Sequence, residues 1–340
     1  MAVTLNEVAR AAQVSVSTAS LAFSGAGPIA AATRDRVLKA AAELGYQGPN
    51  PMAASLRRGR TGVIGIVTDD DLRHSFRDPV SVQVLDGIAG ALGEAGYGVL
   101  LIPRQDPAGK PHPLLRSAAI DAAIMFYAIT ARDPAIAALR RRKIPMVAMS
   151  GNPRGVAMVN VQERRGMREL GDYLRGAGHE RIGVATLPYS HARRSGWADL
   201  DEAPTYSVTA ARLAGIRDAG IEPAAIWECR GSLVDEGIAA GRELLELTPT
   251  PTALIGFSDL IAAGMLLAAR EAGLEVPGAV AIAGFDGVDL PWLSGERLTT
   301  VNQPRRDRGA VAAETALALA GGTSPGNQTL GVELVVGTTT

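Results

Sequence analysis

Residues 4–46 read TLNEVARAAQVSVSTASLAFSGAGPIAAATRDRVLKAAAELGY, and this stretch decides how the chain begins to fold. Thr4 and Glu7 form a Thr-x-x-Glu capping pattern, and apolar residues follow at helical spacing, so a short helix is predicted directly after the cap. Ser15 can cap a second short helix over residues 16–23, whose first turn carries only small side chains. The two helices are therefore expected to be joined by a tight turn.

A third amphipathic helix is predicted over residues 31–44, with Val37, Ala41 and Leu44 on one face and Gly45 as its C-terminal stop. This helix completes a small core with the first two. Such an arrangement is typical of a helix-turn-helix domain, in which the second helix enters the DNA major groove by its N-terminal end.

Charge is distributed unevenly along the chain. The first sixty residues carry seven basic and three acidic side chains, a net charge of +4, so the remainder carries −5 because all 340 residues together carry −1. A small basic head on an acidic body is typical of a nucleic-acid-reading module joined to a soluble partner domain, although ten charges can also divide this way by chance. The length predicts two or three domains, and a composition of 47% hydrophobic and 20% charged residues excludes a disordered chain.

The remaining composition argues against several classes of protein. A single cysteine, Cys229, excludes an intramolecular disulfide and a cysteine-based zinc cluster, and we interpret it as a buried, reduced thiol. The N-terminal segment has no apolar signal core, and no uninterrupted apolar run reaches membrane length, so a cytoplasmic protein without membrane contact is expected. The four histidines lack metal-ligand spacing, and phosphate-loop, nucleophile-elbow and dinucleotide motifs are absent. We therefore expect no enzyme, no cofactor and no metal.

The body alternates short apolar runs with amphipathic stretches. This alternation predicts parallel sheets with right-handed crossovers, and the elements divide into two doubly wound lobes. The expected fold is an all-α helix-turn-helix head joined to an α/β body of two doubly wound parallel-sheet lobes. Ligands of such sheets bind beyond the carboxyl ends of the strands, which predicts a ligand site in a cleft between the lobes. The strand-like runs cover residues 63–67, 99–102, 122–126, 145–149, 182–186, 226–229, 253–257 and 280–284.

Residues 49–60 separate the head from the body. Pro51 can start a helix of about two turns that Gly59 ends, and a helix this short is unstable alone in water. From these residues alone, a solvated linker is the more ordinary interpretation.

The sequence resembles LacI-type (lactose-repressor family) transcriptional regulators over essentially its full length. The motifs that carry the resemblance are VTLNEVARAAQVSVSTAS, TRDRVLKAAAELGY and PNPMAASL, in the head and at its junction with the body. The resemblance implies a sequence-specific DNA-binding regulator, a repressor, controlled by a small-molecule effector bound in a periplasmic-binding-protein-like body. It also implies a homodimer on a palindromic double-stranded DNA operator. The alternative function is a solute-binding protein of the same two-lobed fold, which needs an export signal and no basic head.

The resemblance further implies four parts of the chain, with crossings between the lobes near Val161, Thr300 and Gly326. The parts are a helix-turn-helix DNA-binding domain (1–48), a hinge helix (49–60), an N-terminal effector lobe (61–161 with 301–325) and a C-terminal effector lobe (162–300 with 326–340). Because no leucine heptads follow the last predicted strand, a dimer without a tetramerising tail is expected.

DNA contacts are implied at ten positions that match the family. Val16 and Ser17 take the positions that read base edges, and Leu56 takes the position of the leucine that enters the minor groove. Leu21 stands where the family usually has Arg, which leaves the preferred operator half-site open. The other implied contacts are Ser15, Thr18, Ser20, Ser24, Thr33, Ala53 and Arg57.

Effector contacts are implied at Asp78, Arg212, Ser258 and Asp286. A cationic fork and a carboxylate opposed across a cleft suit a hydroxyl-rich or heterocyclic ligand, although a surface ion pair is the ordinary alternative for Arg212 and Asp286. The aromatic pair expected after Asp78 is replaced by Val-Ser, which argues against an ordinary sugar pocket. Residues 187–206 form a longer loop than the resemblance predicts, and a mobile solvated segment is the ordinary interpretation of it. The alternative is a lid or an effector contact formed by His191, Arg193, Arg194, Trp197, Asp199 and Asp201.

Overall fold

The computed structural model describes residues 3–24, 27–48, 59–69, 72–127, 129, 133–199, 202–293 and 295–340. The chain divides into two compact units, Met1–Gly62 and Val63–Thr340. The predicted hinge contacts Ala53, Leu56 and Arg57 lie outside the described residues.

The first unit contains the three predicted helices, α1 (Leu5–Ala11), α2 (Val16–Ser24) and α3 (Ala31–Leu44). The capping box at the start of α1 is formed, since the Thr4 backbone N–H donates to the Glu7 carboxylate at 2.7 Å. Gly45 ends α3 with φ +69°, a left-handed conformation that suits glycine. Small buried side chains allow the three helices to approach closely around this core: Val8, Ala9, Ala12, Ala19, Ala22, Val37, Ala40 and Ala41.

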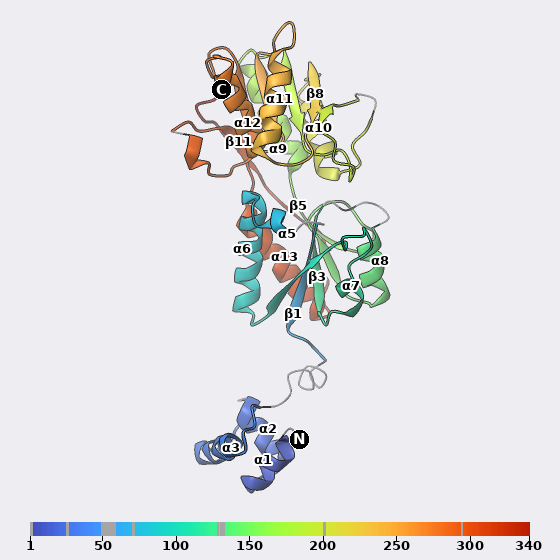
Figure 1. Ribbon diagram of the computed structural model, residues 1–340, viewed down its shortest axis with the longest axis vertical. Helices are drawn as coiled ribbons and strands as arrows, with labels where there is room; N and C mark the ends of the chain where they lie inside the picture. The colour runs from blue at the N-terminus through green and yellow to red at the C-terminus, as the bar shows by residue number, and fades with distance from the viewer. Residues whose placement is uncertain are drawn as a thin grey trace. The chain divides into compact units, whose positions relative to one another are not determined.

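The second unit begins with a six-stranded sheet whose neighbouring strands are all parallel. Side chains alternate along β1, so that Ile64 and Ile66 pack with α6 and α13 while Val67 packs with α7 and α8. These two groups of helices cover opposite faces of the sheet (Figure 1). The strand order is β12 (Gln328–Leu330), β5 (Ala157–Val161), β4 (Met146–Ala148), β3 (Ala122–Phe126), β1 (Val63–Thr68), β2 (Gly98–Pro103). The helices of this lobe are α5 (Leu72–Ser75), α6 (Pro79–Glu94), α7 (Leu114–Ser117), α8 (Pro134–Arg141) and α13 (Arg305–Ala320).

The other lobe is built on a seven-stranded sheet that is parallel except at its two edges. One face is covered by α9 and α10 and the other by α11 and α12. The strand order is β13 (Glu333–Val335), β11 (Thr299–Asn302), β10 (Ala281–Asp286), β9 (Ala253–Gly256), β6 (Ile182–Thr186), β8 (Ala225–Glu228), β7 (Gly196–Trp197). Its helices are α9 (Glu163–Gly176), α10 (Ser207–Asp218), α11 (Val234–Leu245), α12 (Asp259–Glu271) and the 3-10 turn η1 (Pro291–Leu293). The expected fold class is confirmed.

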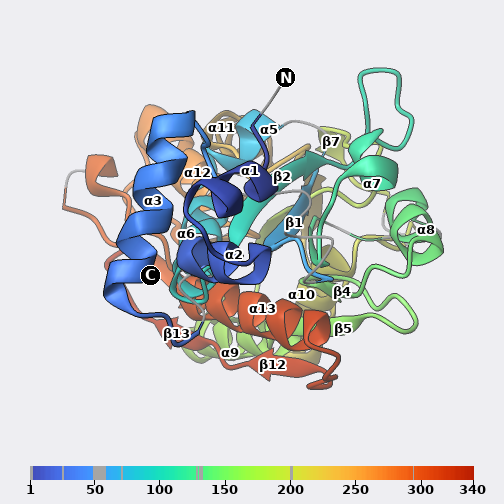
Figure 2. The same cartoon turned by 90° about the horizontal axis from the view of Figure 1, so that it is seen from below.

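The chain passes between the lobes three times. The first passage joins β5 to α9, and the second joins β11 to α13, which runs beside β4 and β5 (Figure 2). The third passage follows β12, whose Leu330 still pairs with Val161 in the first sheet, whereas β13 pairs with β11 in the second. The prediction of a crossing near Gly326 was therefore wrong. The chain crosses at Gly331, because residues 328–330 add a parallel strand to the first sheet.

Helices α6 and α13 approach so closely that glycine is required at their contact. A Cβ atom at Gly87 would lie 2.0 Å from the Arg306 carbonyl oxygen, and one at Gly309 would lie 2.1 Å from the Val84 carbonyl oxygen. The two helix backbones therefore touch directly, and this contact positions the segment that returns from the second lobe.

Replacing Gly87 with alanine is expected to lower the free energy of unfolding by about 1–3 kcal/mol, because the added methyl group overpacks the α6–α13 contact. Gly90→Ala is the matched control, since Gly90 lies in the same helix with open space around it. The control substitution should raise the free energy of unfolding by up to about 1 kcal/mol. Urea denaturation of both variants tests this contact, and equal effects would contradict it.

Candidate functional site

A cavity of about 240 Å³ lies between the two lobes of the second unit. Its polar lining comes from the carboxyl ends of parallel strands, with Asp69 directly after β1, Ser258 shortly after β9 and Asp286 at the end of β10. The four residues predicted to contact an effector, Asp78, Arg212, Ser258 and Asp286, all line this cavity. Sequence positions more than 200 apart are thus brought to one site.

Arg212, on α10, lies at the centre of the site with 3% of its side chain exposed. Its Nε donates to Glu163 Oε2 at 2.7 Å, and its Nη1 donates to the Phe257 carbonyl oxygen. Its Nη2 lies 3.5 Å from Asp286 Oδ1, and the guanidinium lies 3.6 Å from the centroid of the Phe285 ring. The ion pair with Asp286 therefore exists, but it is buried and not the surface pair considered as the alternative.

The backbone of Asp286 adopts φ +126°, a conformation that a non-glycine residue rarely takes. Contacts from the next crossing segment hold this strained residue in place. Gln303 Nε2 donates to Asp286 Oδ1 at 2.7 Å, and Arg305 donates to the Asp286 carbonyl oxygen. Arg305 also donates to Gln83 Oε1 of α6 at 2.8 Å. The carboxylate is thus fixed toward the cavity by groups that reach both lobes.

Burial raises the pKa of the Asp286 carboxyl well above its usual range, while the nearby charge of Arg212 lowers it. Burial also raises the pKa of Asp259, which does not line the cavity. Asp259 instead accepts from the Thr300 hydroxyl at 2.5 Å and from the Val288 backbone N–H at 2.8 Å. Its contacts organise the loop that follows β10.

Two of the predicted site residues also cap helices. Asp78 precedes α6 and accepts from the backbone N–H and the hydroxyl of Ser81, at 3.0 and 2.6 Å. Ser258 precedes α12, accepts from the Ile261 N–H at 3.2 Å and receives the Ser232 hydroxyl at 2.9 Å. Both side chains are therefore rigidly placed at the cavity wall by the start of a helix.

Several cavity residues were not found from the sequence. Asp69 could have been found, because it lies two residues after the predicted strand 63–67. Arg308 is held by neutral partners, with Nη2 donating to the Met149 carbonyl oxygen, and no local pattern indicates its position. Arg193 lines the cavity and belongs to the loop residues considered for a lid or an effector contact. The other cavity residues that were missed are Ser150, Glu163, Tyr206, Thr209, Ser232 and Gln303.

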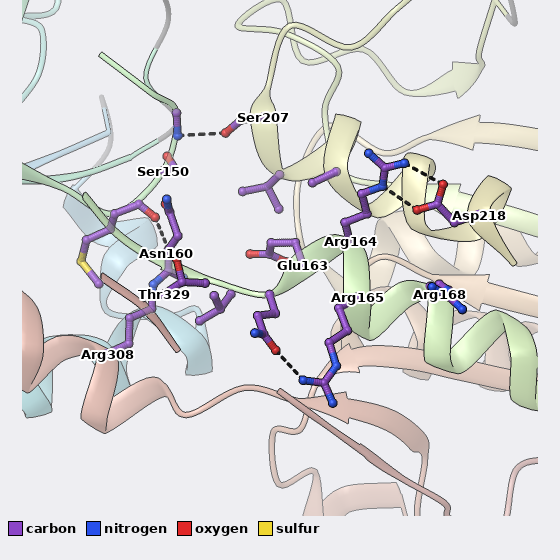
Figure 3. A pocket seen from close by; sticks show the side chains of 16 residues that line it. Ser150, Asn160, Glu163, Arg164, Arg165, Arg168, Ser207, Asp218, Arg308 and Thr329 are labelled. Atoms are coloured by element: carbon purple, nitrogen blue, oxygen red, sulfur yellow. Dashed lines mark hydrogen bonds and ion pairs between the residues drawn. The ribbon is translucent and has the colours of Figure 1, made fainter. Parts of the chain in front are cut away.

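A larger hollow of about 590 Å³ lies beside the passage from β5 to α9, and Figure 3 shows its lining. Arg164 forms two hydrogen bonds with Asp218 there, at 2.5 and 2.7 Å. Arg165 donates to Gln162 at 3.0 Å and to Glu169 at 2.7 Å. Because Arg164 and Arg165 are 63% and 60% exposed to solvent whereas Arg212 is buried, the size of this hollow does not make it the better ligand site.

Four of the predicted DNA contacts of the head, Ser15, Val16, Ser17 and Thr18, lie at the start of α2. Val16 is 45% exposed, and Ser17 beside it is exposed as well. The Ser15 hydroxyl accepts from the Thr18 N–H at 3.1 Å, so it caps α2 in the free protein. An exposed apolar side chain beside hydroxyls at a helix N-terminus can contact a thymine methyl group and nearby phosphates. Ser20 and Thr33 are half-buried, and Ser24 is exposed.

Among the described residues, no helix is long and apolar enough to cross a membrane. Within the same residues, no group of histidine, cysteine and acidic side chains is arranged to hold a metal ion. Cys229 is buried, as predicted.

Comparison with known proteins gives matches for both units. Residues 4–50 match the family of bacterial regulatory proteins called the lacI family, and residues 172–340 match a periplasmic binding protein-like domain. An HTH-type transcriptional regulator of Mycobacterium tuberculosis is 32% identical over 99% of this chain and 96% of its own length. The HTH-type transcriptional repressor CytR of Escherichia coli is 31% identical over 92% of this chain and 88% of its own length.

A solved structure of the lac repressor dimer, bound to operator and an anti-inducer, has the same fold. It superposes with a TM-score of 0.82 at 24% identity, covering 100% of this chain and 99% of that one.

The pH dependence of stability tests the environment of Asp286. Because its folded pKa is raised, its contribution to stability is complete below about pH 4, the usual carboxyl value, and is lost as pH rises through the raised pKa. Asp286→Asn keeps the acceptor for Gln303 and cannot ionise. The unfolding free energy of the wild type should therefore fall relative to that of the variant between pH 4 and 8, as measured by urea denaturation. A constant difference over this range would exclude the raised pKa.

Proposed function

Because the chain belongs to the lacI family of bacterial regulatory proteins, we propose how its two units divide the work of a DNA-binding transcriptional regulator. The head reads an operator, and the body binds a small-molecule effector that changes operator affinity. One observation carries this function: a single chain joins a helix-turn-helix head to a two-lobed body with a buried arginine at an inter-lobe cavity. A coupling of about 1–3 kcal/mol between the two sites is typical of such regulators.

Operator reading is assigned to the first turn of α2. Val16 contacts a thymine methyl group and Ser17 a base edge, while Ser15, Thr18, Ser20, Ser24 and Thr33 bind phosphates. The exposure of Val16 supports this role, since covering an exposed apolar side chain with a binding partner lowers the free energy of the complex. In the same proposal Leu56 enters the minor groove, Arg57 faces phosphates, and Ala53 is a further DNA contact.

The effector is a small, neutral, hydroxyl-rich molecule. Four carboxylates line the cavity, from Asp69, Asp78, Glu163 and Asp286, and they can accept hydrogen bonds from ligand hydroxyls. Arg212 can donate in return, although its charge is already balanced by Glu163, which disfavours a strongly anionic ligand. The cavity volume of about 240 Å³ suits a ligand of monosaccharide size.

The regulator acts as a homodimer in the cytoplasm, as a repressor, and performs no catalytic step. A palindromic operator requires two heads related by a two-fold axis, which supports dimerisation. Effector binding changes the closure of the two lobes and thereby the pairing of the two hinge segments on DNA.

Operator reading is tested on a site selected from random duplex DNA with the wild-type protein. Val16→Ala should weaken binding to that site by about 1–3 kcal/mol and relax its sequence preference, since one base contact is lost. Leu38→Ala is the matched control, because Leu38 is a similarly exposed apolar side chain on α3, away from the proposed reading turn. Fluorescence anisotropy measures operator binding by both variants, and equal losses of affinity would refute the assignment.

Deletion of residues 1–60 should abolish operator binding and leave a folded effector-binding body.

Effector binding is tested by calorimetry with a panel of pentoses, hexoses and cyclic polyols. Arg212→Gln should weaken binding of the best ligand at least about 10-fold, because a charge-assisted donor of the cavity is removed. Arg164→Gln is the control, since its guanidinium lines only the larger hollow and pairs with Asp218. If only the Arg164 variant loses effector binding, the effector binds in the larger hollow and not in the cavity at Arg212.

A further inference from the structure

An ion pair joins the two lobes directly across the cavity. Asp69 follows β1 of the first lobe, and Arg193 lies in the segment 189–199, which leads from β6 toward α10 in the second lobe. The Arg193 guanidinium donates to the Asp69 carboxylate, and both side chains line the cavity. Since 38% of the Arg193 side chain and 22% of the Asp69 side chain are exposed, the pair lies at the solvent side of the cavity.

The Asp69 carboxylate has a second cationic neighbour in its own lobe. Arg104 follows β2, is 5% exposed, and lies with Nη2 3.7 Å from Asp69 Oδ1. The carboxylate thus lies between two guanidiniums, one from each lobe. If the lobes separate, Asp69 keeps the buried Arg104 as its neighbour while Arg193 moves into water. Separation therefore leaves no buried charge without a partner, so the contact can open at low cost.

The segment that carries Arg193 has an unusual backbone conformation at Arg193 itself. Arg193 itself has φ +47°, the left-handed region that arginine rarely adopts. Its backbone N–H donates to the Ser190 carbonyl oxygen at 3.3 Å. His191 forms a 2.5 Å hydrogen bond with the Tyr206 hydroxyl, directly before α10. The segment is thus folded so that Arg193 points across to the first lobe, and such strain is common at functional sites.

A second contact crosses between the lobes near the start of α10. The Gly151 backbone N–H of the first lobe donates to the Ser207 hydroxyl of the second at 2.9 Å. Ser207 directly follows Tyr206, whose hydroxyl is hydrogen-bonded to His191 of the Arg193 segment. Two contacts near this segment therefore join the lobes: the Gly151–Ser207 hydrogen bond and the Arg193–Asp69 ion pair.

We propose that Arg193 and Asp69 form a latch that holds the effector cavity closed in the ligand-free protein. An effector must separate this pair to enter, and the pair forms again over the bound ligand. This inference goes beyond the proposed function, because it concerns the ligand-free chain and does not depend on the identity of the effector.

Hydrogen–deuterium exchange of the full-length, ligand-free protein tests the latch. Arg193→Gln should speed exchange of the amides of residues 189–199 about three- to fivefold, the factor that a partly exposed ion pair provides. Asp69→Asn, in the opposite lobe, should speed exchange of the same amides by a similar factor. The double variant should exchange no faster than the faster single variant, because both substitutions remove one interaction.

Arg194→Gln is the matched control. Arg194 is the next residue in the same segment, is 70% exposed, and pairs with Glu202 rather than with the first lobe. Its substitution should leave exchange of residues 189–199 unchanged. The latch is refuted if the Arg193 and Arg194 variants behave alike, or if Asp69→Asn leaves the segment unchanged.

Folding of the first lobe is monitored in the same experiment. Arg193→Gln preserves the Asp69–Arg104 contact, so peptides from β1 and β2 should exchange as in the wild type. If Asp69→Asn speeds exchange in those peptides and not in residues 189–199, the carboxylate serves only its own lobe and the latch is refuted. Failure of the effector panel in calorimetry would overturn the proposed effector class and leave this result untouched.

Discussion

The ligand end of the second lobe depends on one buried guanidinium. Arg212 joins α10 to the first turn of α9 through Glu163, to the end of β9 through the Phe257 carbonyl oxygen, and to the end of β10 through Phe285 and Asp286. A charge buried to this extent is tolerated only with such partners, and its removal would leave carboxylates buried without compensation. The geometry of the cavity wall and the stability of the lobe are therefore set by the same residue.

Most of the fold could be predicted from the sequence because its signals are local. The capping box at Thr4 and Glu7, the helical spacing of α3 and the buried strands of the body all follow from neighbouring residues. The third crossing could not be placed in the same way. Residues 328–330 form a strand of only three residues, too short for a periodic pattern, and their pairing with β5 depends on contacts distant in sequence.

The candidate site was predictable only in part, for a related reason. Asp78, Arg212, Ser258 and Asp286 lie at helix starts or strand ends, or match a family motif, and these four line one cavity. The pairing of Arg193 with Asp69 could not be found, because Arg193 lies in a loop without periodicity and Asp69 lies more than 120 positions away in the sequence. Sequence patterns therefore indicated the walls of the cavity and not the contact that joins its two sides.

The contacts of Arg305 constrain how the ligand site of such a protein can evolve. Its planar side chain contacts the backbone of Asp286 and Gly287 in one lobe and Gln83 of α6 in the other. A substitution that shifts the backbone of the turn after β10 would thus also displace Arg305, which contacts a helix of the opposite lobe. The shape of this part of the ligand site and the linkage between the two lobes are therefore coupled through one side chain.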